Sequence, residues 1–162
     1  MSDPRRVERS IQVSNLMSRR VVTVGTGVSC LVALQQMHAA GVRHLPVVSR
    51  EGLLVGMLTD RDLRHHLFTP RSFEALAGTA VETILAATVV AEIMSTGVIA
   101  VSPEETVAEA AWTMRKYQIG ALPVTEHGRV VGIVTELDIL RHIVRTDVGQ
   151  TPACAEIIVP RP

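Results

Sequence analysis

The hydrophobic positions of this chain switch between two spacings, and the switches follow one order. Short β-branched or apolar runs bounded by turn residues predict strands, whereas apolar residues at every third or fourth position predict helices. In the first half these patterns predict a helical turn at 13–17, a strand at 21–24, a helix at 28–40, strands at 45–48 and 53–58, and a helix that begins near Thr59. Gly41 follows the apolar run of the long helix and predicts its end.

The second half of the chain repeats the first. Met17 corresponds to Met94, 77 positions later, whereas Gly56 corresponds to Gly132, 76 positions later, so one residue has been deleted from a loop. Each unit predicts the order helix, strand, helix, strand, strand, helix, which is an α/β fold. Because a unit of this size buries too little apolar surface alone, we expect the two units to pack on each other.

These patterns divide the chain into a leader at 1–11, a first repeat at 12–68, a connecting helix at 69–88, a second repeat at 89–146 and a tail at 147–162. The apolar spacing over 72–87 predicts an amphipathic helix that covers one end of the core. In the second repeat, Ser102 and Pro103 followed by Glu105 predict a helix N-terminus with a capping box. The equivalent segment 25–28 is a weaker start, so we expect the first repeat to open more readily there.

Composition narrows the classes of function. The chain contains 47% hydrophobic but only 2% aromatic residues, and its 16 basic residues balance its 16 acidic residues. Without net charge, no global field attracts nucleic acid or an anionic membrane surface. No apolar run approaches membrane-spanning length, so we expect a cytoplasmic protein. Cys30 and Cys154 do not have the spacing of a zinc site or a disulfide framework, and no pattern of Ser, His and Asp predicts catalysis.

Two other groups of side chains have simple interpretations. His65 and His66 have no acidic or Cys neighbours at ligand spacing, so they are interpreted as exposed helix residues and not as metal ligands. Trp112, Met114 and Tyr117 share one predicted helix and are interpreted as core or dimer contacts rather than a stacking platform for bases.

Each repeat ends in the motif Gly-x-x-Thr-x-x-Asp, in which Thr59 and Asp62 correspond to Thr135 and Asp138. The Thr lies where a strand runs into a helix, and a helix N-terminus presents free N–H groups and a positive dipole to a phosphate. An Asp at this position can accept hydrogen bonds from sugar hydroxyls. The alternative is a capping box, which satisfies the same N–H groups without a ligand, although such boxes prefer Glu or Gln at the third position.

The order of the motifs identifies a resemblance. Met17-Ser18 and Met94-Ser95, the Leu-Pro-Val runs at 45–47 and 122–124, and the two Gly-x-x-Thr-x-x-Asp ends resemble a tandem of cystathionine-β-synthase-type (CBS) domains, often called a Bateman module. The resemblance covers about residues 12–144. It implies two CBS repeats packed with pseudo-twofold symmetry, and two clefts between them that bind adenosine-containing ligands such as AMP, ADP, ATP or S-adenosylmethionine. It also implies a homodimer, with a candidate face that comprises Leu34, Met37, Val107, Ala110, Ala111 and Met114.

The resemblance further implies which residues form each cleft. In such modules the motif Asp holds the ribose hydroxyls, and residues of the partner repeat sandwich the adenine. Carried onto this chain, one cleft would use Thr59 and Asp62 with Thr96, Ile99 and Ile119. The other would use Thr135 and Asp138 with Val22, Thr23 and Val42.

The two implied clefts differ in charge. The residues just before the Leu-Pro strand, which often meet phosphates in such modules, are Arg43 and His44 in the first repeat but Gly120 and Ala121 in the second. Charge-assisted contacts to phosphate are roughly twice as strong as neutral ones. We therefore predict that the cleft of Asp62 favours a phosphorylated ligand, and that the other cleft binds a less charged ligand, binds weakly or stays empty. A solvated Arg-His pair on a loop is the alternative.

The sequence thus leads to the hypothesis of a regulatory module that is not an enzyme. It binds an adenine nucleotide, which Mg²⁺ can accompany in the case of ATP, and passes the signal to an unidentified regulated protein or through a homodimer. A sensor of S-adenosylmethionine, a structural or interaction protein with vestigial clefts, and a nucleotide-hydrolysing enzyme stay open as alternatives. Nucleic acid and membrane are not expected partners.

Overall fold

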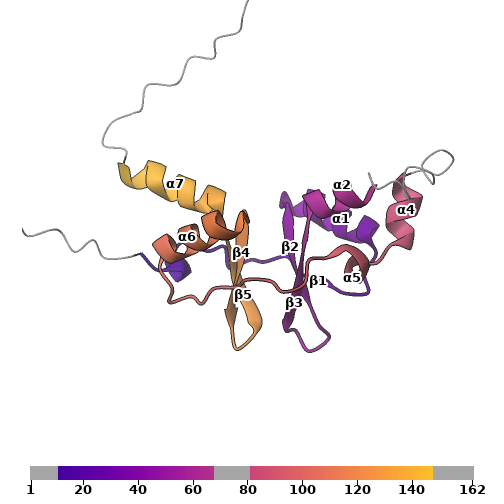
Figure 1. Ribbon diagram of the computed structural model, residues 1–162, viewed down its shortest axis with the longest axis horizontal. Helices are drawn as coiled ribbons and strands as arrows, with labels where there is room; N and C mark the ends of the chain where they lie inside the picture. Colours follow the sequence, from indigo (N-terminus) through magenta and orange to yellow (C-terminus); the bar gives the residue numbers. More distant parts are fainter. Residues whose placement is uncertain (1–10, 68–80, 148–162) are drawn as a thin grey trace, which may run out of the picture.

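The computed structural model describes residues 11–67 and 81–147 of the chain. The first repeat contains η1 (Val13–Asn15), β1 (Val24–Gly25), α1 (Cys30–Ala40), β2 (His44–Val48), β3 (Leu54–Thr59) and α2 (Asp60–Leu67). A connecting helix, α4 (Val81–Ala87), leads to α5 (Val90–Ile93), α6 (Val107–Tyr117), β4 (Ala121–Glu126), β5 (Arg129–Thr135) and α7 (Glu136–Asp147). Figure 1 shows the repeats side by side, each a mixture of helices and strands, which confirms the α/β prediction.

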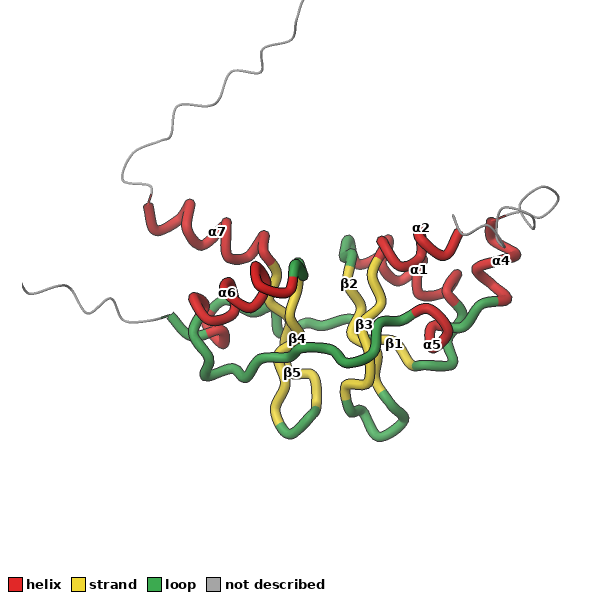
Figure 2. Tube along the Cα trace, viewed as in Figure 1, coloured by secondary structure: helices red, strands yellow, loops and turns green. Residues whose placement is uncertain are grey.

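Each repeat is built on an antiparallel hairpin whose register buries its apolar residues. β2 pairs with β3 so that Leu45 lies opposite Leu58, and β4 pairs with β5 so that Leu122 lies opposite Val134. All four side chains are fully buried. Figure 2 shows the two hairpins next to each other, with their turns at one end of the molecule and most of the helices at the other.

The strand expected first in each repeat is shorter than its β-branched sequence predicts. In the first repeat only Val24–Gly25 is a strand, paired in parallel with β2, and in the second a single parallel bridge joins Val101 to Val124. The expected strand at 21–24 is therefore wrong in its extent. The reason is that this part of the chain crosses between repeats: Ser18 still pairs with Ile133 of the second repeat, so only residues beyond the crossing reach the first sheet.

The helix α1 begins at Cys30, two residues after the predicted start, and ends at Ala40 as predicted. The Oγ of Ser29 accepts a hydrogen bond from the N–H of Val32, which satisfies one free donor of the first turn. Gly41 ends the helix in the left-handed conformation, with φ of 64°, a geometry that Gly adopts without steric cost. The predicted end of this helix is confirmed.

The start of α6 corrects the sequence prediction. The helix begins after Thr106, which forms a reciprocal capping box with Glu109, rather than at Ser102 and Pro103. The N–H of Ser102 does donate to Glu105 at 2.8 Å, but this contact closes a turn. Two Ser/Thr-x-x-Glu patterns stand in succession here, and the second one caps the helix because the apolar helical run begins only after it.

The two hydrophobic cores exchange their entry segments. The first core surrounds Met37 and Leu45 and includes Leu85 of α4 and Val90 of α5, which precede the second repeat in the chain. The second core surrounds Met114 and Leu122 and includes Val13 and Met17, which precede the first repeat. Leu85 thus covers an end of the first core, as expected of the connecting helix, although the predicted helical residues 72–80 lie outside the described part of the chain.

The motif glycines make room for this exchange. A Cβ on Gly56 would lie 2.5 Å from the Sδ of Met94, and a Cβ on Gly132 would collide with the Sδ of Met17. Next to these contacts, Ser95 and Met57 exchange backbone hydrogen bonds of 3.0 and 2.9 Å. The Met-Ser pair of one repeat therefore packs on the Gly motif of the other, and the two motifs found separately in the sequence form one contact.

The dimer face suggested by the resemblance is wrong for its central residues. Met37, Ala110 and Met114 are buried inside the cores of their own repeats, so they cannot meet a second molecule. Small and Met residues at helical spacing pack the helices onto their own sheets instead. Trp112 and Tyr117 are exposed, so of the two interpretations offered for them, core contacts are excluded.

Candidate functional site

Thr and Asp form the same reciprocal cap at the start of α2 and of α7. The Oδ2 of Asp62 accepts hydrogen bonds from the N–H and the hydroxyl of Thr59, at 2.8 and 2.7 Å, and the Oγ1 of Thr59 accepts one from the N–H of Asp62, at 3.2 Å. Asp138 and Thr135 make the same three bonds at 2.9, 2.7 and 3.3 Å. Both Asp residues are half-buried, and these bonds hold each Asp side chain against the first turn of its helix.

These caps occupy one carboxylate oxygen of each Asp. Thr106 and Glu109 make the same set of bonds at the start of α6, so a capping box forms with Asp as well as with Glu. At Asp62 and Asp138, the two accepted bonds both end on Oδ2, and Oδ1 takes part in neither. Capping and sugar binding are therefore compatible, since the second oxygen can accept a hydroxyl hydrogen bond while the first holds the helix start.

The two hairpins meet along a line that we call the seam, where Leu53 bridges to Arg129. The N–H of Leu54 donates to the carbonyl of Gly128 across this line at 2.9 Å. At the other end of the seam, the Nε2 of His44 lies 3.9 Å from the position that a Cβ of Gly120 would occupy, and the Oε2 of Glu136 lies 3.5 Å from it. His44 of the first repeat therefore faces the start of α7 in the second.

The electrostatics of the seam centre on His44. Burial lowers the pKa of its imidazole from the usual 6.5, and the neighbouring Arg43 guanidinium lowers it further. The carboxylates that oppose this change, because they attract the protonated form, are Asp60, Asp62 and Glu136. His44 is therefore within electrostatic reach of the acidic starts of both α2 and α7.

The residue before each Leu-Pro strand is tied to the helix start of its own repeat. The N–H of Asp60 donates to the carbonyl of Arg43 at 3.1 Å, and the N–H of Glu136 donates to the carbonyl of Gly120 at 3.0 Å. The backbone of Arg43 is therefore bonded to the start of α2, and its side chain is exposed. Gly120 occupies the equivalent place beside α7 and has no side chain. The first repeat therefore has a positive charge at a position where the second repeat has none, as the sequence indicated.

The remaining predicted cleft residues differ in exposure. Thr23 and Thr96 are exposed. The half-buried apolar residues pack against the core of the repeat that contains them: Val22 and Val42 against the first, Ile99 and Ile119 against the second. Thr96 follows Ser95, which is bonded to the strand that leads to Thr59. Among the hydrogen bonds of the described residues, none joins Asp62 or Asp138 to these partners, so the two groupings stay predictions.

A shallow depression lies beside Asp62, on the side of α2 that faces α5. Its volume is about 290 Å³, and it is lined by Arg61, Asp62, His65, His66 and Ile93. His65 is exposed as predicted, whereas His66 is half-buried, with its Nε2 3.3 Å from the Oγ1 of Thr88. The sequence analysis missed this grouping, although the spacing of Asp62, His65 and His66 places them on one helix face.

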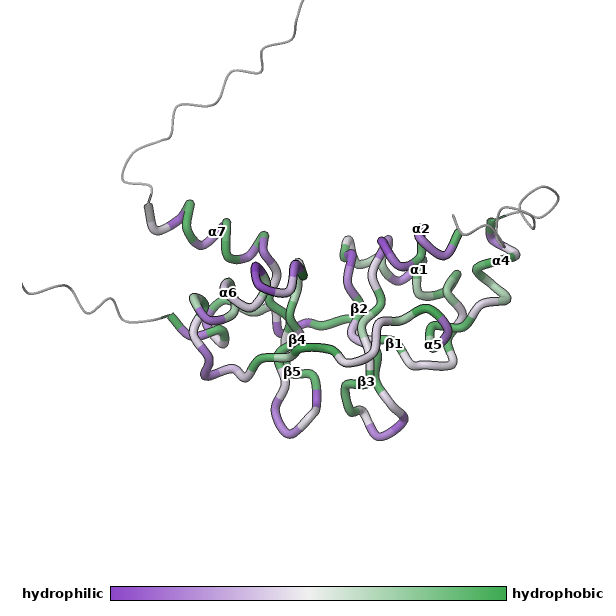
Figure 3. The backbone as a smooth tube through the Cα atoms, viewed as in Figure 1, coloured by the Kyte–Doolittle hydropathy of each residue, from purple (hydrophilic) through white to green (hydrophobic). Residues whose placement is uncertain are grey.

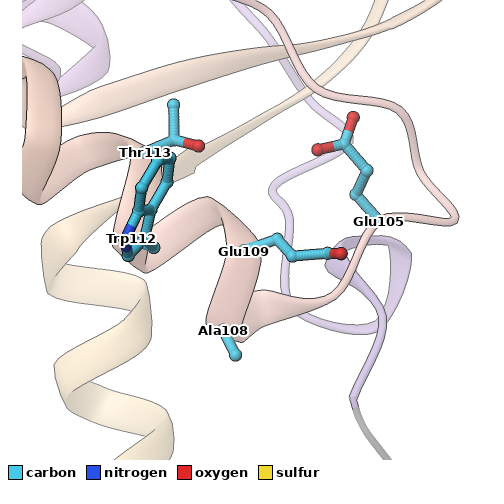
Figure 4. Close-up of a pocket in the computed structure, with 5 residues that line it drawn as sticks. All are labelled: Glu105, Ala108, Glu109, Trp112 and Thr113. Atoms are coloured by element: carbon cyan, nitrogen blue, oxygen red, sulfur yellow. The ribbon is translucent and has the colours of Figure 1, made fainter.

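A second open depression, of ≈ 420 Å³, lies on α6 (Figure 4). It is lined by Glu105, Ala108, Glu109, Trp112 and Thr113. Its carboxylates are engaged in local caps: Glu105 accepts from the N–H of Ser102, and the hydrogen bonds from Thr106 lower the pKa of Glu109. Because these acidic groups serve the backbone, this depression is a weaker candidate than the seam.

The Cys30 thiol and the possible metal-ligating side chains are the other groups that could carry chemistry. Burial raises the pKa of the Cys30 thiol to about 11, with a smaller contribution from Glu92, so the thiolate is disfavoured at neutral pH. Within residues 11–67 and 81–147, no three His, Cys, Asp or Glu side chains are grouped as a metal site would require. In the same part of the chain, no helix combines the length and the apolar character needed to cross a bilayer.

Comparison with known proteins gives one consistent match. Residues 13–69 and 90–145 match the family model described as "CBS domain". A CBS domain-containing protein of Dictyostelium discoideum is 34% identical over 136 residues, which are 83% of this chain and 92% of that protein. The CBS domain pair of protein MJ0100, solved in complex with 5′-methylthioadenosine and S-adenosyl-L-methionine, matches with a TM-score of 0.67 and 31% identity, and the match covers 83% of this chain and 97% of that one.

Some relatives carry the matching region as part of an enzyme. A homoserine O-acetyltransferase of Methanococcoides burtonii (strain DSM 6242) is 33% identical over 132 residues, which are 81% of this chain but only 24% of that enzyme. The chain therefore corresponds to most of one relative and to about a quarter of another. The similarity to the homoserine O-acetyltransferase is confined to these 132 residues.

Proposed function

This chain belongs to the CBS-domain family as a tandem pair, and on that premise we propose that it is a regulatory module that binds an adenine nucleotide such as AMP, ADP or ATP. The ligand lies at the seam, where the starts of α2 and α7 meet the opposite repeat. Binding changes the populations of different relative orientations of the two repeats, because a ligand between them has a different affinity for each orientation.

One observation carries this proposal: the paired caps leave the same acceptor at both helix starts. Asp62 and Asp138 each use Oδ2 for the cap, and each keeps Oδ1 for a further bond. A cis-diol such as that of ribose offers two adjacent hydroxyl donors, which a carboxylate at a helix start can accept. Capping alone does not explain why both seam motifs carry Asp, whereas the cap outside the seam carries Glu109.

The ligands of a related structure support the nucleoside part of the proposal. The matched pair of protein MJ0100 was solved with 5′-methylthioadenosine and S-adenosyl-L-methionine, two ligands that share adenosine and lack phosphate. The preference for phosphate therefore rests on residues of this chain. The backbone of Arg43 is bonded to the start of α2, its side chain is exposed, and His44 is the next residue, so we propose that the Asp62 cleft takes the phosphorylated ligand.

Isothermal titration calorimetry with adenosine, AMP, ATP, S-adenosylmethionine and GMP tests the proposal on the full chain. We expect AMP or ATP to bind more tightly than adenosine, and GMP not to bind. Because a hydrogen bond to a charged group contributes about 1.5–3 kcal/mol, Arg43→Ala and Asp62→Ala should each weaken AMP binding about 10- to 100-fold. Asp138→Ala should leave this AMP site in place.

Glu109→Ala is the matched control for these variants. It removes a capping box of the same geometry from α6, away from the seam, so it should lower stability without changing AMP affinity. Unchanged AMP affinity in Arg43→Ala together with complete loss in Asp138→Ala would reverse the assignment of the clefts. If none of the adenosine ligands shifts the melting temperature at millimolar concentration, the clefts are vestigial and the structural alternative holds.

The remaining parts of the proposal concern the setting of the module. We propose that it has no catalytic activity of its own, that it acts in the cytoplasm, and that a homodimer passes the ligand signal to a regulated protein. Mg²⁺ enters only as the companion of ATP. Tighter binding of S-adenosylmethionine than of any nucleotide would instead favour a sensor of that metabolite, the second candidate, which the ligands of the MJ0100 pair support.

A further inference from the structure

The shallow depression beside Asp62 has a lining that suits an anion. Its volume is about 290 Å³, and four of its five lining residues come from α2: Arg61, Asp62, His65 and His66. Arg61 and His65 are both exposed and lie four residues apart, so they stand one turn from each other on the same side of the helix. A guanidinium has five N–H donors and an imidazole has at least one, and such donors bind phosphate oxygens.

The depression adjoins the cleft that we propose for the nucleotide. Asp62 belongs to both, because its Oδ2 forms the cap at the start of α2 and the residue also lines the depression. The fifth lining residue, Ile93, ends α5, and the chain continues from it to Ser95, which is bridged to Met57 of β3. Thr96, a residue predicted for the same cleft, comes directly after Ser95. A ligand whose ribose lies at Asp62 can therefore extend along α2 into the depression.

The charges at the start of α2 leave a cation for such a ligand. Asp60 is paired with Arg64 at 2.9 Å, so a positive charge offsets this carboxylate. The Oδ2 of Asp62 accepts the two hydrogen bonds of the cap, and these donors stabilise its negative charge. Among the described residues, no ion pair holds Arg61. Its guanidinium is therefore available to a chain of phosphates.

His66 fixes one side of the depression. Its Nε2 lies 3.3 Å from the Oγ1 of Thr88, and this hydroxyl donates a hydrogen bond to the carbonyl of Ile84 at 2.9 Å. Thr88 is only 7% exposed, so the contact ties α2 to the segment that follows α4. Because His66 is engaged in this way, the contacts to a ligand come from Arg61 and His65.

The second repeat has different residues at the equivalent positions. The repeat offset places Leu137 where α2 has Arg61, and Arg141 where it has His65. Leu137 is 48% exposed, so the exposed side chain directly before Asp138 is apolar. Figure 3 shows the same contrast, since α2 is mainly hydrophilic whereas hydrophobic segments recur along α7. Only the first repeat therefore has a cation directly before its motif Asp.

We propose that the Asp62 cleft is specific for a nucleoside triphosphate, whose β- and γ-phosphates lie in the depression on Arg61 and His65. This inference rests on the proposed adenine-nucleotide site and names the ligand within that class. The α-phosphate lies at the start of α2, near Arg43, as proposed for AMP. Only the two outer phosphates reach the side chains of the next turn. The cleft thus distinguishes ATP from AMP by charge-assisted hydrogen bonds that AMP cannot make.

Isothermal titration calorimetry with AMP, ADP and ATP in metal-free buffer tests the inference on the full chain. The wild type should bind ATP at least about tenfold more tightly than AMP, with ADP between them. Arg61→Ala should weaken ATP binding about tenfold and His65→Ala about threefold, whereas AMP binding should change by less than about twofold in each. Arg61→Lys keeps the charge and should recover part of the ATP affinity. Both positions are exposed, so circular dichroism and the melting temperature should show that the variants are folded.

Arg141→Ala is the matched control, because it removes the exposed cation that is equivalent to His65 on α7. It should keep the ATP affinity of the wild type within about twofold. Equal affinities of the wild type for AMP and ATP would overturn the inference and leave the nucleotide site in place. Equal weakening of AMP and ATP in Arg61→Ala would also overturn it, as would a loss of ATP affinity in Arg141→Ala but not in Arg61→Ala. Absence of binding by every nucleotide would overturn the proposed function, and this inference with it.

Discussion

The substitution Gly132→Ala tests the crossed packing of the two repeats. A Cβ at this position would collide with the Sδ of Met17 and would lie 3.0 Å from its Cγ. Met17 is 8% exposed and belongs to the second core, so its side chain has little room to move aside. Overpacking of this kind costs about 1–3 kcal/mol. We therefore expect Gly132→Ala to lower the free energy of unfolding by this amount, and the melting temperature by roughly 3–10 °C.

Urea unfolding of a double-mutant cycle with Met17→Ala measures the contact itself. Met17→Ala alone should cost about 2–5 kcal/mol, because it leaves a cavity in the second core. In the double variant the new Cβ at position 132 no longer meets a side chain, so the combined loss should be smaller than the sum by about 1–2 kcal/mol. Gly25→Ala is the control: its Cβ would meet nothing nearer than a methyl of Val28 at 3.9 Å, and it should change stability by less than about 0.5 kcal/mol.

Two results would refute this reasoning. If Gly132→Ala is as stable as the wild type, Met17 does not occupy the space above residue 132. If the losses of the two single variants simply add, the two residues do not share a contact, and the segment that contains Met17 packs elsewhere. Either result would also remove the explanation for the Gly of the repeated motif.

Three further predictions follow from single sites. Asp62→Glu should keep the cap, as Glu109 does in α6, and should change the melting temperature by less than about 2 °C. Calorimetry should show at least about tenfold weaker AMP binding, because the second carboxylate oxygen moves. Full AMP affinity would leave Asp62 with the capping role alone. Burial lowers the pKa of His44 from 6.5, so as the pH falls the unfolded chain binds this proton before the folded chain does. The free energy of unfolding in urea should therefore fall as the pH drops below 6.5, and His44→Gln should make this dependence on pH weaker. The same dependence in both proteins would contradict the partial burial of His44. Gln118 ends α6 with φ of 55°, so Gln118→Gly should raise stability by about 0.5–1 kcal/mol in calorimetric unfolding, and a loss would show that the Gln side chain makes a stabilising contact.

Much of the candidate site could be predicted because its signals are local. The Thr and Asp of each motif are three residues apart, and the cap they form depends only on a strand that runs into a helix. The charge difference between the repeats was also visible in the sequence, at Arg43 and Gly120. Local patterns failed where two equivalent signals compete, as at Ser102 and Thr106, since the start of α6 depends on where the apolar run can first pack.

The sequence by itself determined the repeat and its α/β elements, and it offered the Thr and Asp cap as one of two interpretations, because periodicity and capping act over a few residues. Only the tertiary structure decided that the entry segment of each repeat belongs to the core of the other, and that Met37 and Met114 lie inside while Leu140 lies outside. Both Met and Leu stand in apolar helical runs, so spacing cannot tell which stripe faces the sheet of its own repeat. That choice depends on the space between elements far apart in the chain, which exists only once both repeats have folded against each other.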